Sequence, residues 1–171
     1  MKQVIVCFAL LMACLTLSAC GFHMRGDLPG TQKDKTVFVT GLSKSNPLYI
    51  NLAQDVTFGG GIMASKPADA SAIINVVRAI HLRRPITLSA AGRANMFDLT
   101  FRVVYDVHNP KGDVLIPEQE LNVRREYFNS QGSPLGQGYE EVQMREEMEK
   151  EAARTLLRQV VFNLRERSGK S

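Results

Sequence analysis

Cysteine is scarce in this chain of 171 residues: it occurs three times, always within the first twenty positions. Cys7 and Cys14 lie in an apolar leader that we expect to be removed, which leaves Cys20 as the single thiol of the mature protein. A chain with one thiol forms no internal disulfide. The scarcity also excludes a cysteine-ligated zinc site and a cysteine nucleophile elsewhere in the chain.

The sequence also lacks a recognisable catalytic frame. It has no G-x-S-x-G, no H-E-x-x-H and no paired carboxylates in a familiar arrangement. The histidines, His23, His81 and His108, have no partner at a spacing typical of a metal site or a triad, and we interpret them as tether, strand surface and turn edge. The glycine run at 59–61 is followed by no Lys-Ser/Thr pair and is interpreted as a flexible connector. We therefore predict a protein that is not an enzyme and has no cofactor and no metal.

Composition indicates one ordinary globular domain. Charged residues make up 22% and aromatic residues 7% of the sequence, which argues against bulk disorder. The net charge is +4, or +3 without Lys2, too small an excess to identify an anionic partner. After the leader, no apolar segment is long enough to span a membrane. The leader itself, as an export signal, argues against nucleic acid as a partner.

The first nineteen residues have the layout of a removable signal. Lys2 supplies a positive start, and residues 4–17 are uncharged and almost wholly apolar, which is short for a membrane span of roughly 20 residues. Residues 17–20, Leu-Ser-Ala-Cys, resemble the lipobox of bacterial lipoproteins, in which the cysteine receives a diacylglycerol and, after cleavage before it, an N-acyl chain. We therefore predict a signal peptide at 1–19 and a lipidated Cys20. The alternative is an ordinary secretory signal cut at the same place.

The residue after Cys20 bears on location. In many Gram-negative lipoproteins an aspartate there retains the protein in the inner membrane, whereas a glycine, here Gly21, permits export to the outer membrane. Two or more acyl chains anchor a protein stably to a bilayer. The sequence therefore predicts a protein that is lipid-anchored at the periplasmic side of the cell outer membrane.

The first part of the mature chain predicts a tether, a strand and a helix. Residues 20–35 are rich in polar residues and glycine and are interpreted as the tether, and residues 35–41 are β-branched enough for a short strand. Asn46 followed by a proline predicts the start of a helix of about three turns that ends at the glycine run. One side of this helix is expected to carry the apolar residues Leu48, Leu52 and Val56, with Ile62 as a further candidate.

The period of the apolar residues changes to two after residue 72. Residues 73–83 predict one strand, and residues 93–108 a long strand with one apolar and one polar face. A strong turn signal at 109–113 is followed by a partner strand at about 121–127. Residues 129–138 are interpreted as a loop.

An amphipathic helix is predicted at about 140–165. Its apolar residues recur every four positions: Met144, Met148, Ala152, Leu156, Val160 and Leu164. Glu141 with Arg145 and Glu146 with Lys150 are favourable pairs that we expect on the outer side. The order strand, helix, three strands, helix predicts an α+β two-layer sandwich, with an about four-stranded mixed sheet and two helices on one face. We expect one domain at 36–165 and a C-terminal tail at 166–171.

Arginines gather on or beside the predicted hairpins: Arg78, Arg83, Arg84, Arg93, Arg102, Arg124 and Arg125. The planar guanidinium donates two hydrogen bonds at once and suits phosphate and carboxylate groups. Since no acidic residue lies between Ala79 and Phe97, we predict that Arg83, Arg84 and Arg93 form the anion-binding group. The alternative is a solvated strand face with ion pairs to Asp98, Asp106, Glu120 and Glu126.

The residues at the lipobox carry a family resemblance. Residues 20–25, Cys-Gly-Phe-His-Met-Arg, resemble the Cys-Gly-aromatic-His-hydrophobic-Arg opening of the LptE family of lipopolysaccharide-assembly lipoproteins. The later pattern is similar in order over nearly the whole mature chain: a turn at Gly92, a long alternating strand from Phe97, the hairpin at 109–113, Arg-Glu-Tyr-Phe at 125–128 and a final helix with Met and Ala.

The resemblance implies an outer-membrane lipoprotein that is seated as a plug in the lumen of the β-barrel LptD, in a 1:1 complex. Together the two place lipopolysaccharide in the outer leaflet, and the lipoprotein helps its barrel to fold. The resemblance further implies lipopolysaccharide contacts from basic residues near the Gly92 turn and near 130–140. Here Arg93 lies beside that turn, but Ala90 and Ala91 are neutral and residues 129–138 contain no cation. A polar strand face would suit a polar barrel lumen.

Two other classes of function are weighed against this one. The first is a lipid-anchored periplasmic module that binds peptidoglycan or another envelope glycan. The second is an envelope hydrolase, which the lack of a catalytic frame disfavours.

Overall fold

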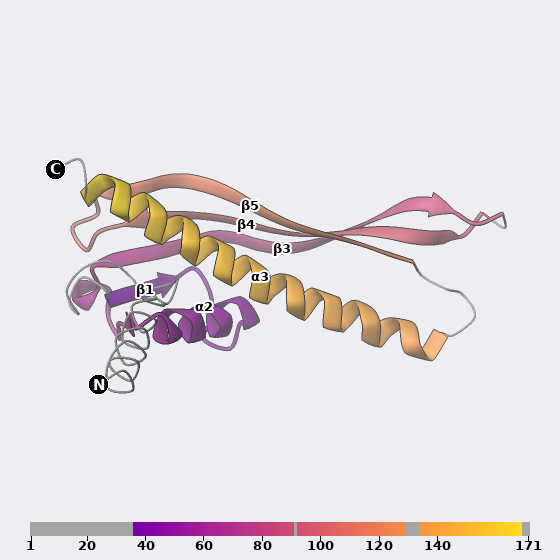
Figure 1. The fold of residues 1–171 in the computed structure, drawn as a ribbon, viewed down its shortest axis with the longest axis horizontal. Coiled ribbons are helices and arrows are strands. Elements are labelled where there is room, and N and C mark those ends of the chain that lie inside the picture. Colours follow the sequence, from indigo (N-terminus) through magenta and orange to yellow (C-terminus); the bar gives the residue numbers. More distant parts are fainter. Residues whose placement is uncertain (1–35, 91, 129–133, 169–171) are drawn as a thin grey trace, which may run out of the picture.

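The computed structural model describes residues 36–90, 92–128 and 134–168. The signal peptide, Cys20 and the tether predicted from the sequence lie outside these residues. The elements are β1 (Thr36–Thr40), α2 (Pro47–Phe58), β2 (Ile62–Met63), the short 3-10 helix η2 (Pro67–Asp69), β3 (Ala72–Leu88), β4 (Ala94–His108), β5 (Val114–Phe128) and α3 (Pro134–Ser168) (Figure 1).

One mixed sheet of five strands has the order β2-β1-β3-β4-β5. β1 runs parallel to both β2 and β3, whereas β3, β4 and β5 form an antiparallel meander. The predicted α+β class and the two helices are confirmed, but the sheet has one strand more than expected. The extra strand is β2, whose Ile62 pairs with Thr36 instead of continuing the apolar side of α2. Two residues are too short to display a period, so the sequence pattern could not identify β2.

The ends of the helices follow local chemistry. The side chain of Asn46 accepts a hydrogen bond of 2.9 Å from the backbone N–H of Leu48, and Pro47 occupies the first turn of α2. The glycine run ends α2 as predicted, with Gly60 at φ 75°. α3 begins at Pro134, inside the segment interpreted as a loop, and continues three residues into the expected tail.

Two of the three long strands, β3 and β5, exceed their predicted bounds, whereas β4 (Ala94–His108) matches the predicted strand at 93–108. β3 continues through Pro85 to Leu88, and β5 begins at Val114, directly after the turn. In that turn, Asn109 Oδ1 accepts hydrogen bonds of 2.9 Å from the backbone N–H groups of Lys111 and Asp113. The sequence pattern underestimated β3 and β5 because the residues at the C-terminal end of β3 and at the N-terminal end of β5 alternate polar and apolar side chains poorly and pair through the backbone.

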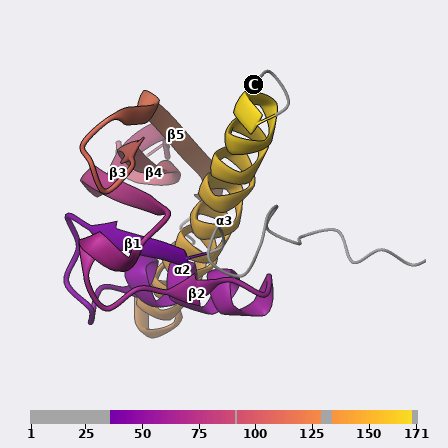
Figure 2. The same ribbon diagram turned by 90° about the vertical axis from the view of Figure 1, so that its left-hand side faces the viewer.

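A single apolar core lies between the sheet and the helices. α2 packs beside α3, and α3 packs across β4 and β5, so both helices cover one face of the sheet (Figure 2). The fully buried side chains are Tyr105, Leu48, Leu52, Ile74, Leu99, Met148, Leu156, Val56, Val103, Val107 and Val160. Burying one such side chain stabilises the fold by roughly 1.5–3 kcal/mol. The apolar positions predicted for α2 and for α3 from Met148 to Val160 are confirmed as core.

The molecule has two regions along the strands. The "base" contains β1, α2, β3 residues 72–81, β4 residues 101–108, β5 residues 114–123 and α3 residues 148–168. The "arm" contains β3 residues 82–88, β4 residues 94–100, β5 residues 124–128 and α3 residues 139–147. The register joins these strand segments, because Leu82 pairs with Thr100 and Thr100 with Arg124. The arm extends well past the layer of β1 and α2 (Figure 1).

Candidate functional site in the arm

The helix-facing side of the arm is organised around Glu141. Its carboxylate accepts a hydrogen bond from the Tyr127 hydroxyl and bonds of 2.7 and 3.0 Å from Arg145, and it lies 3.2 Å from Arg83 Nε. The Arg83 guanidinium lies 3.5 Å from the centroid of the Phe97 ring, a cation–π contact. The predicted pair of Glu141 with Arg145 is confirmed, but the expectation that it lies on the outer side is wrong, because Glu141 faces the sheet.

The protonation of this cluster follows from its charges. Burial raises the pKa of Glu141, but the hydrogen bonds from Tyr127 and Arg145 and the charges of Arg145 and Arg83 outweigh it, so the pKa lies below its ordinary value. Burial and the hydrogen bond to Glu141 raise the pKa of the Tyr127 hydroxyl. Glu141 is therefore an anion and Tyr127 a neutral donor at neutral pH, which matches the hydrogen bond between them.

Asp98 organises the opposite side of the arm. Its Oδ2 lies 2.7 Å from Arg124 NH2 and 3.2 Å from Arg84 NH2. The Asp98 side chain is only 5% exposed, because the two arginine side chains, 61% and 73% exposed, lie over it near the surface. The hydrogen bond from Arg124 is the main cause that holds the pKa of Asp98 below its ordinary value. One carboxylate thus orients two guanidinium groups that still face solvent, with a net charge of +1.

The three predicted arginines do not share one surface. Arg83 and Arg84 are consecutive in β3 and therefore point to opposite faces of the sheet. Arg83 faces α3 and contacts Glu141, whereas Arg84 belongs to the open face with Asp98. Arg93 is exposed at the end of the hairpin, roughly 16 Å farther along the strands. The alternative of ion pairs on a strand face therefore describes Arg84 better than a three-cation cluster does.

Arg124 is a functional candidate that the sequence reasoning did not select. It comes from β5, far from Arg84 in sequence, and only the pairing of both strands with β4 places the two beside Asp98. The sequence pattern did place Arg124 on the polar face of the predicted strand at about 121–127. The register needed to connect it with Asp98 was not readable from the sequence.

Two of the histidines lie in the described residues, and both have acidic neighbours. His81 Nε2 lies 2.8 Å from Glu149 of α3, and the ring stacks on Phe101 at 4.3 Å between centroids. Its interpretation as strand surface is wrong, since the ring is enclosed between the sheet and α3. His108 pairs with Asp106 on the same strand. Among the described residues no group of three or more His, Cys, Asp and Glu is placed to hold a metal ion.

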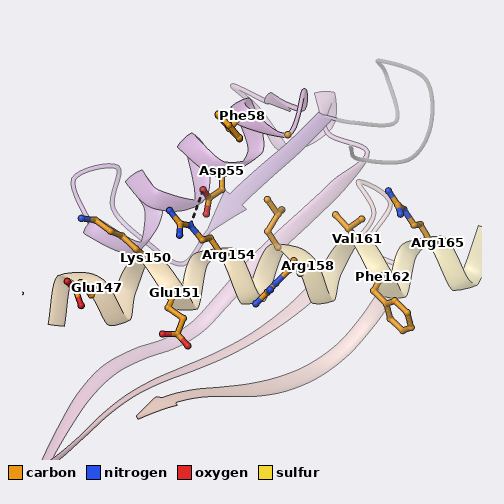
Figure 3. A pocket seen from close by; sticks show the side chains of 12 residues that line it. Asp55, Phe58, Glu147, Lys150, Glu151, Arg154, Arg158, Val161, Phe162 and Arg165 are labelled. Carbon is orange, nitrogen blue, oxygen red and sulfur yellow. Dashed lines mark ion pairs between the residues drawn. The ribbon is translucent and has the colours of Figure 1, made fainter. Parts of the chain in front are cut away.

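An open groove runs between α2 and α3 in the base. Figure 3 shows the Arg154 guanidinium directed toward the Asp55 carboxylate, 4.0 Å away, while Phe162 points away from α2. Burial raises the pKa of Asp55 against the opposing charge of Arg154. The groove has charges of both signs and no histidine, serine or cysteine in its lining. Its charged residues are the carboxylates Asp55, Glu147 and Glu151 and the cations Lys150, Arg154, Arg158 and Arg165.

Comparison with known proteins identifies the family. The family model LptE, described as lipopolysaccharide-assembly, matches residues 35–160, well over half of the chain. This chain belongs to the LptE family. LPS-assembly lipoprotein LptE of Photorhabdus laumondii subsp. laumondii is 24% identical over 161 residues, which cover 94% of this chain and 87% of that protein. The sequence resemblance to LptE is thus confirmed.

Solved structures share the fold. Lipoprotein B of Nitrosomonas europaea matches with a TM-score of 0.67 and 27% identity, over 82% of this chain and 90% of its own. A minor lipoprotein of Acinetobacter baumannii, 15% identical with a TM-score of 0.65 over 79% of this chain and 95% of its own, shows the fold alone.

Membership of the LptE family establishes a lipoprotein with a role in lipopolysaccharide assembly at the outer membrane. This role is consistent with a protein that catalyses no reaction. In the part of the chain that the structure describes, no helix is both long and apolar enough to cross a membrane.

Proposed function

We propose that this LptE-family lipoprotein is the plug and assembly scaffold of an LptD-type β-barrel. It binds the barrel in a 1:1 complex with its domain in the lumen, and the complex inserts lipopolysaccharide into the outer leaflet. Acyl chains on Cys20 anchor the lipoprotein at the periplasmic side of the outer membrane. The charged clusters on the two sides of the arm are the observation that carries this proposal.

The arm supports a plug because both of its sides carry fixed charges on a rigid backbone. The Glu141 cluster occupies one side and the Arg84–Asp98–Arg124 triad the other. Along the same open face Arg102 lies 3.4 Å from Glu120 and donates a hydrogen bond of 3.2 Å to Asn122. A barrel lumen is polar and wet, so a partner there is expected to present hydrogen-bonding groups rather than a continuous apolar patch.

Co-purification from solubilised outer membranes tests the plug. A large barrel protein should be recovered with the lipoprotein in a 1:1 ratio. If no barrel protein is recovered, the proposal is wrong. A variant in which residues 86–96 are replaced by a two-residue Asn-Gly turn shortens the arm without touching the base. We expect the far-UV circular dichroism of this variant to remain that of a folded protein. The amount of barrel protein that co-purifies with it should fall several-fold. The groove variant Phe58→Ser is the control, because Phe58 is 90% exposed in the base.

We also propose direct contact with lipopolysaccharide through arginines of the arm. Arg84 and Arg124 present two oriented guanidinium groups on the open face, and Arg93 adds a cation at the hairpin end. A guanidinium group can donate two parallel hydrogen bonds to a phosphate group. Arg83, the remaining arginine of the predicted set, acts in this proposal by holding α3 through Glu141.

Binding of purified lipopolysaccharide at several salt concentrations tests these contacts. Replacing Arg84 and Arg93 together by glutamine should weaken binding roughly tenfold at low salt, because charge-assisted hydrogen bonds are lost. The salt dependence of the affinity should also become shallower. The paired control replaces Lys150 and Arg158 in the base by glutamine, which alters net charge equally. If both variants weaken lipopolysaccharide binding equally, Arg84 and Arg93 contribute only through the net charge of the protein and not through specific contacts.

A further inference from the structure

β3 has an open edge. On one side β3 pairs with β4 over nearly its whole length, but on the other side β1 covers only Ala72–Asn75. Beyond that point, none of the described strands pairs with β3 on the side of β1. The backbone from Val77 to Arg84 therefore presents roughly 25 Å of strand edge without a neighbouring strand.

Gly41 explains why β1 leaves this edge. It follows the last residue of β1 and adopts φ +84°, a conformation that side chains disfavour. A Cβ on Gly41 would lie 2.0 Å from the carbonyl oxygen of Val76, so only glycine can pass this close to β3. The chain turns here toward α2 and vacates the edge.

The exposed edge carries apolar and cationic side chains. Val77 is 52% exposed, and Ile80 and Leu82 are each 37% exposed. The only charged residues of β3 are arginines: Arg78, Arg83 and Arg84. Pro85 has no backbone N–H, so the unbroken run of donors ends at Arg84.

We propose that the Val77–Arg84 edge accepts one further strand, an extended acidic segment of the barrel protein. This proposal rests on the proposed function, because it names the contact by which the two chains join. Main-chain hydrogen bonds to the open edge would supply affinity, and alternating side chains would supply specificity. Arg83 and Arg84 already pair with Glu141 and Asp98. An acidic side chain at the cross-strand position would therefore form its favourable pair with Arg78.

Charge argues against a second copy of this chain as the occupant. Edge-to-edge pairing of two β3 strands would set arginines of one copy beside arginines of the other, and no acidic residue of β3 could compensate. Charged side chains are a common means by which proteins keep exposed edges from pairing with themselves. Arg78, which has no ion pair among the described residues, therefore disfavours a second copy and favours an acidic strand.

Residue-resolved hydrogen–deuterium exchange on the full lipoprotein, alone and in its co-purified complex, tests the proposal. In a paired strand, successive N–H groups point to alternate sides, so about half of the Val77–Arg84 amides face the open edge. These should exchange fast in the isolated protein and at least about tenfold more slowly in the complex. The amides bonded to β4 should be slow in both and serve as the internal reference.

Each other outcome overturns the proposal and identifies the cause. If barrel protein is present but the edge amides stay fast, the edge is not the contact, while the plug function stands. If these amides become slow in the isolated protein as its concentration rises, the occupant is a second copy. If no barrel protein accompanies the lipoprotein, the proposed function fails and the edge contact with it.

Charge reversal adds a second measurement, the yield of barrel protein, which does not depend on the labelling. Arg78→Glu should lower the yield of barrel protein several-fold and restore fast exchange at the edge, whereas Arg78→Lys should retain both. Arg158→Glu on the exposed side of α3 is the matched control. An unchanged yield and unchanged protection with Arg78→Glu would contradict an acidic partner.

Discussion

The two halves of α3 are held against the sheet by different forces. In the base, Met148, Ala152, Leu156 and Val160 are buried and pack into the apolar core. In the arm, Met144 still packs against the apolar core, which includes the buried Leu99. Ion pairs and hydrogen bonds, chiefly those of Glu141 with Arg83 and Tyr127, add a large polar share of the contacts there. Apolar burial does not depend on pH or salt in the way that ion pairs do. The base is therefore the stable platform, and the arm is the part whose docking can respond to its surroundings.

This difference matters for the proposed plug. A region held by polar contacts opens locally at lower cost than an apolar core and can exchange its internal partners for those of another protein. The base would remain folded during such an exchange. Four substitutions test the contrast between the two regions, beginning with the one of largest expected effect.

Leu52→Ala should destabilise the base most strongly. Leu52 is fully buried in α2, and a leucine truncated in a packed core lowers the free energy of unfolding by about 2–5 kcal/mol. Urea denaturation followed by circular dichroism measures the loss. Ile50→Ala, on the exposed side of the same helix and 43% exposed, should change stability little. A similar loss from both substitutions would contradict the assignment of the core.

Glu141→Gln should release the N-terminal half of α3. The substitution keeps the size of the side chain but removes the charge that Arg83 and Arg145 face, at a cost of about 1–2 kcal/mol. We expect faster amide exchange within residues 139–147 and unchanged exchange in the base. Glu140→Gln, on an exposed neighbour, serves as the control. Equal acceleration in both halves of α3 would show that the arm and the base open as one unit.

Asp98→Asn should reveal a pH-dependent contribution from the open face. Because the folded pKa of Asp98 lies below its ordinary value of 3.8, the charged form stabilises the fold above that pH, and this contribution is lost as the pH falls through the folded pKa. At neutral pH the substitution should cost about 1 kcal/mol, reduced by the exposure of both arginines. Urea denaturation across this pH range should show the variant and the wild type converging in acid. A constant difference would exclude the carboxylate charge as the cause.

Arg102→Ala is expected to have the smallest effect. Arg102 and Glu120 are 38% and 48% exposed, and pairs of this kind contribute less than about 1 kcal/mol. The unfolding free energy should therefore change by no more than about 0.5 kcal/mol, and added salt should remove the difference. A larger loss would indicate that the open face is more strongly coupled to the core than its exposure suggests.

Much of the base could be predicted because its signals are local. Asn46 as cap, the four-residue spacing of apolar side chains in α3 and the turn at 109–113 each depend on neighbours in sequence. The arm was predicted less well. There β3 continues past its predicted end at residue 83, and α3 begins at Pro134 inside an expected loop; in the base, the missed residues are those of β2 and the first half of β5.

The candidate site shows the same limit. The sequence selected Arg83, Arg84 and Arg93 because no acidic residue lies near them along the chain. In the structure Arg84 shares Asp98 with Arg124, a residue forty positions away, and Arg83 contacts Glu141 from the last helix. Neighbours in a sheet are set by register across strands, which a local pattern does not contain.

The sequence by itself determined the α+β class, the two helices, the apolar face of each long element and the resemblance to the LptE family, because composition, period and short motifs are written along the chain. The tertiary structure alone decided which charges meet across strands, that β2 joins the sheet, and that β3 is left open beyond Asn75. These features depend on contacts between distant segments, above all on the close passage of Gly41 against Val76.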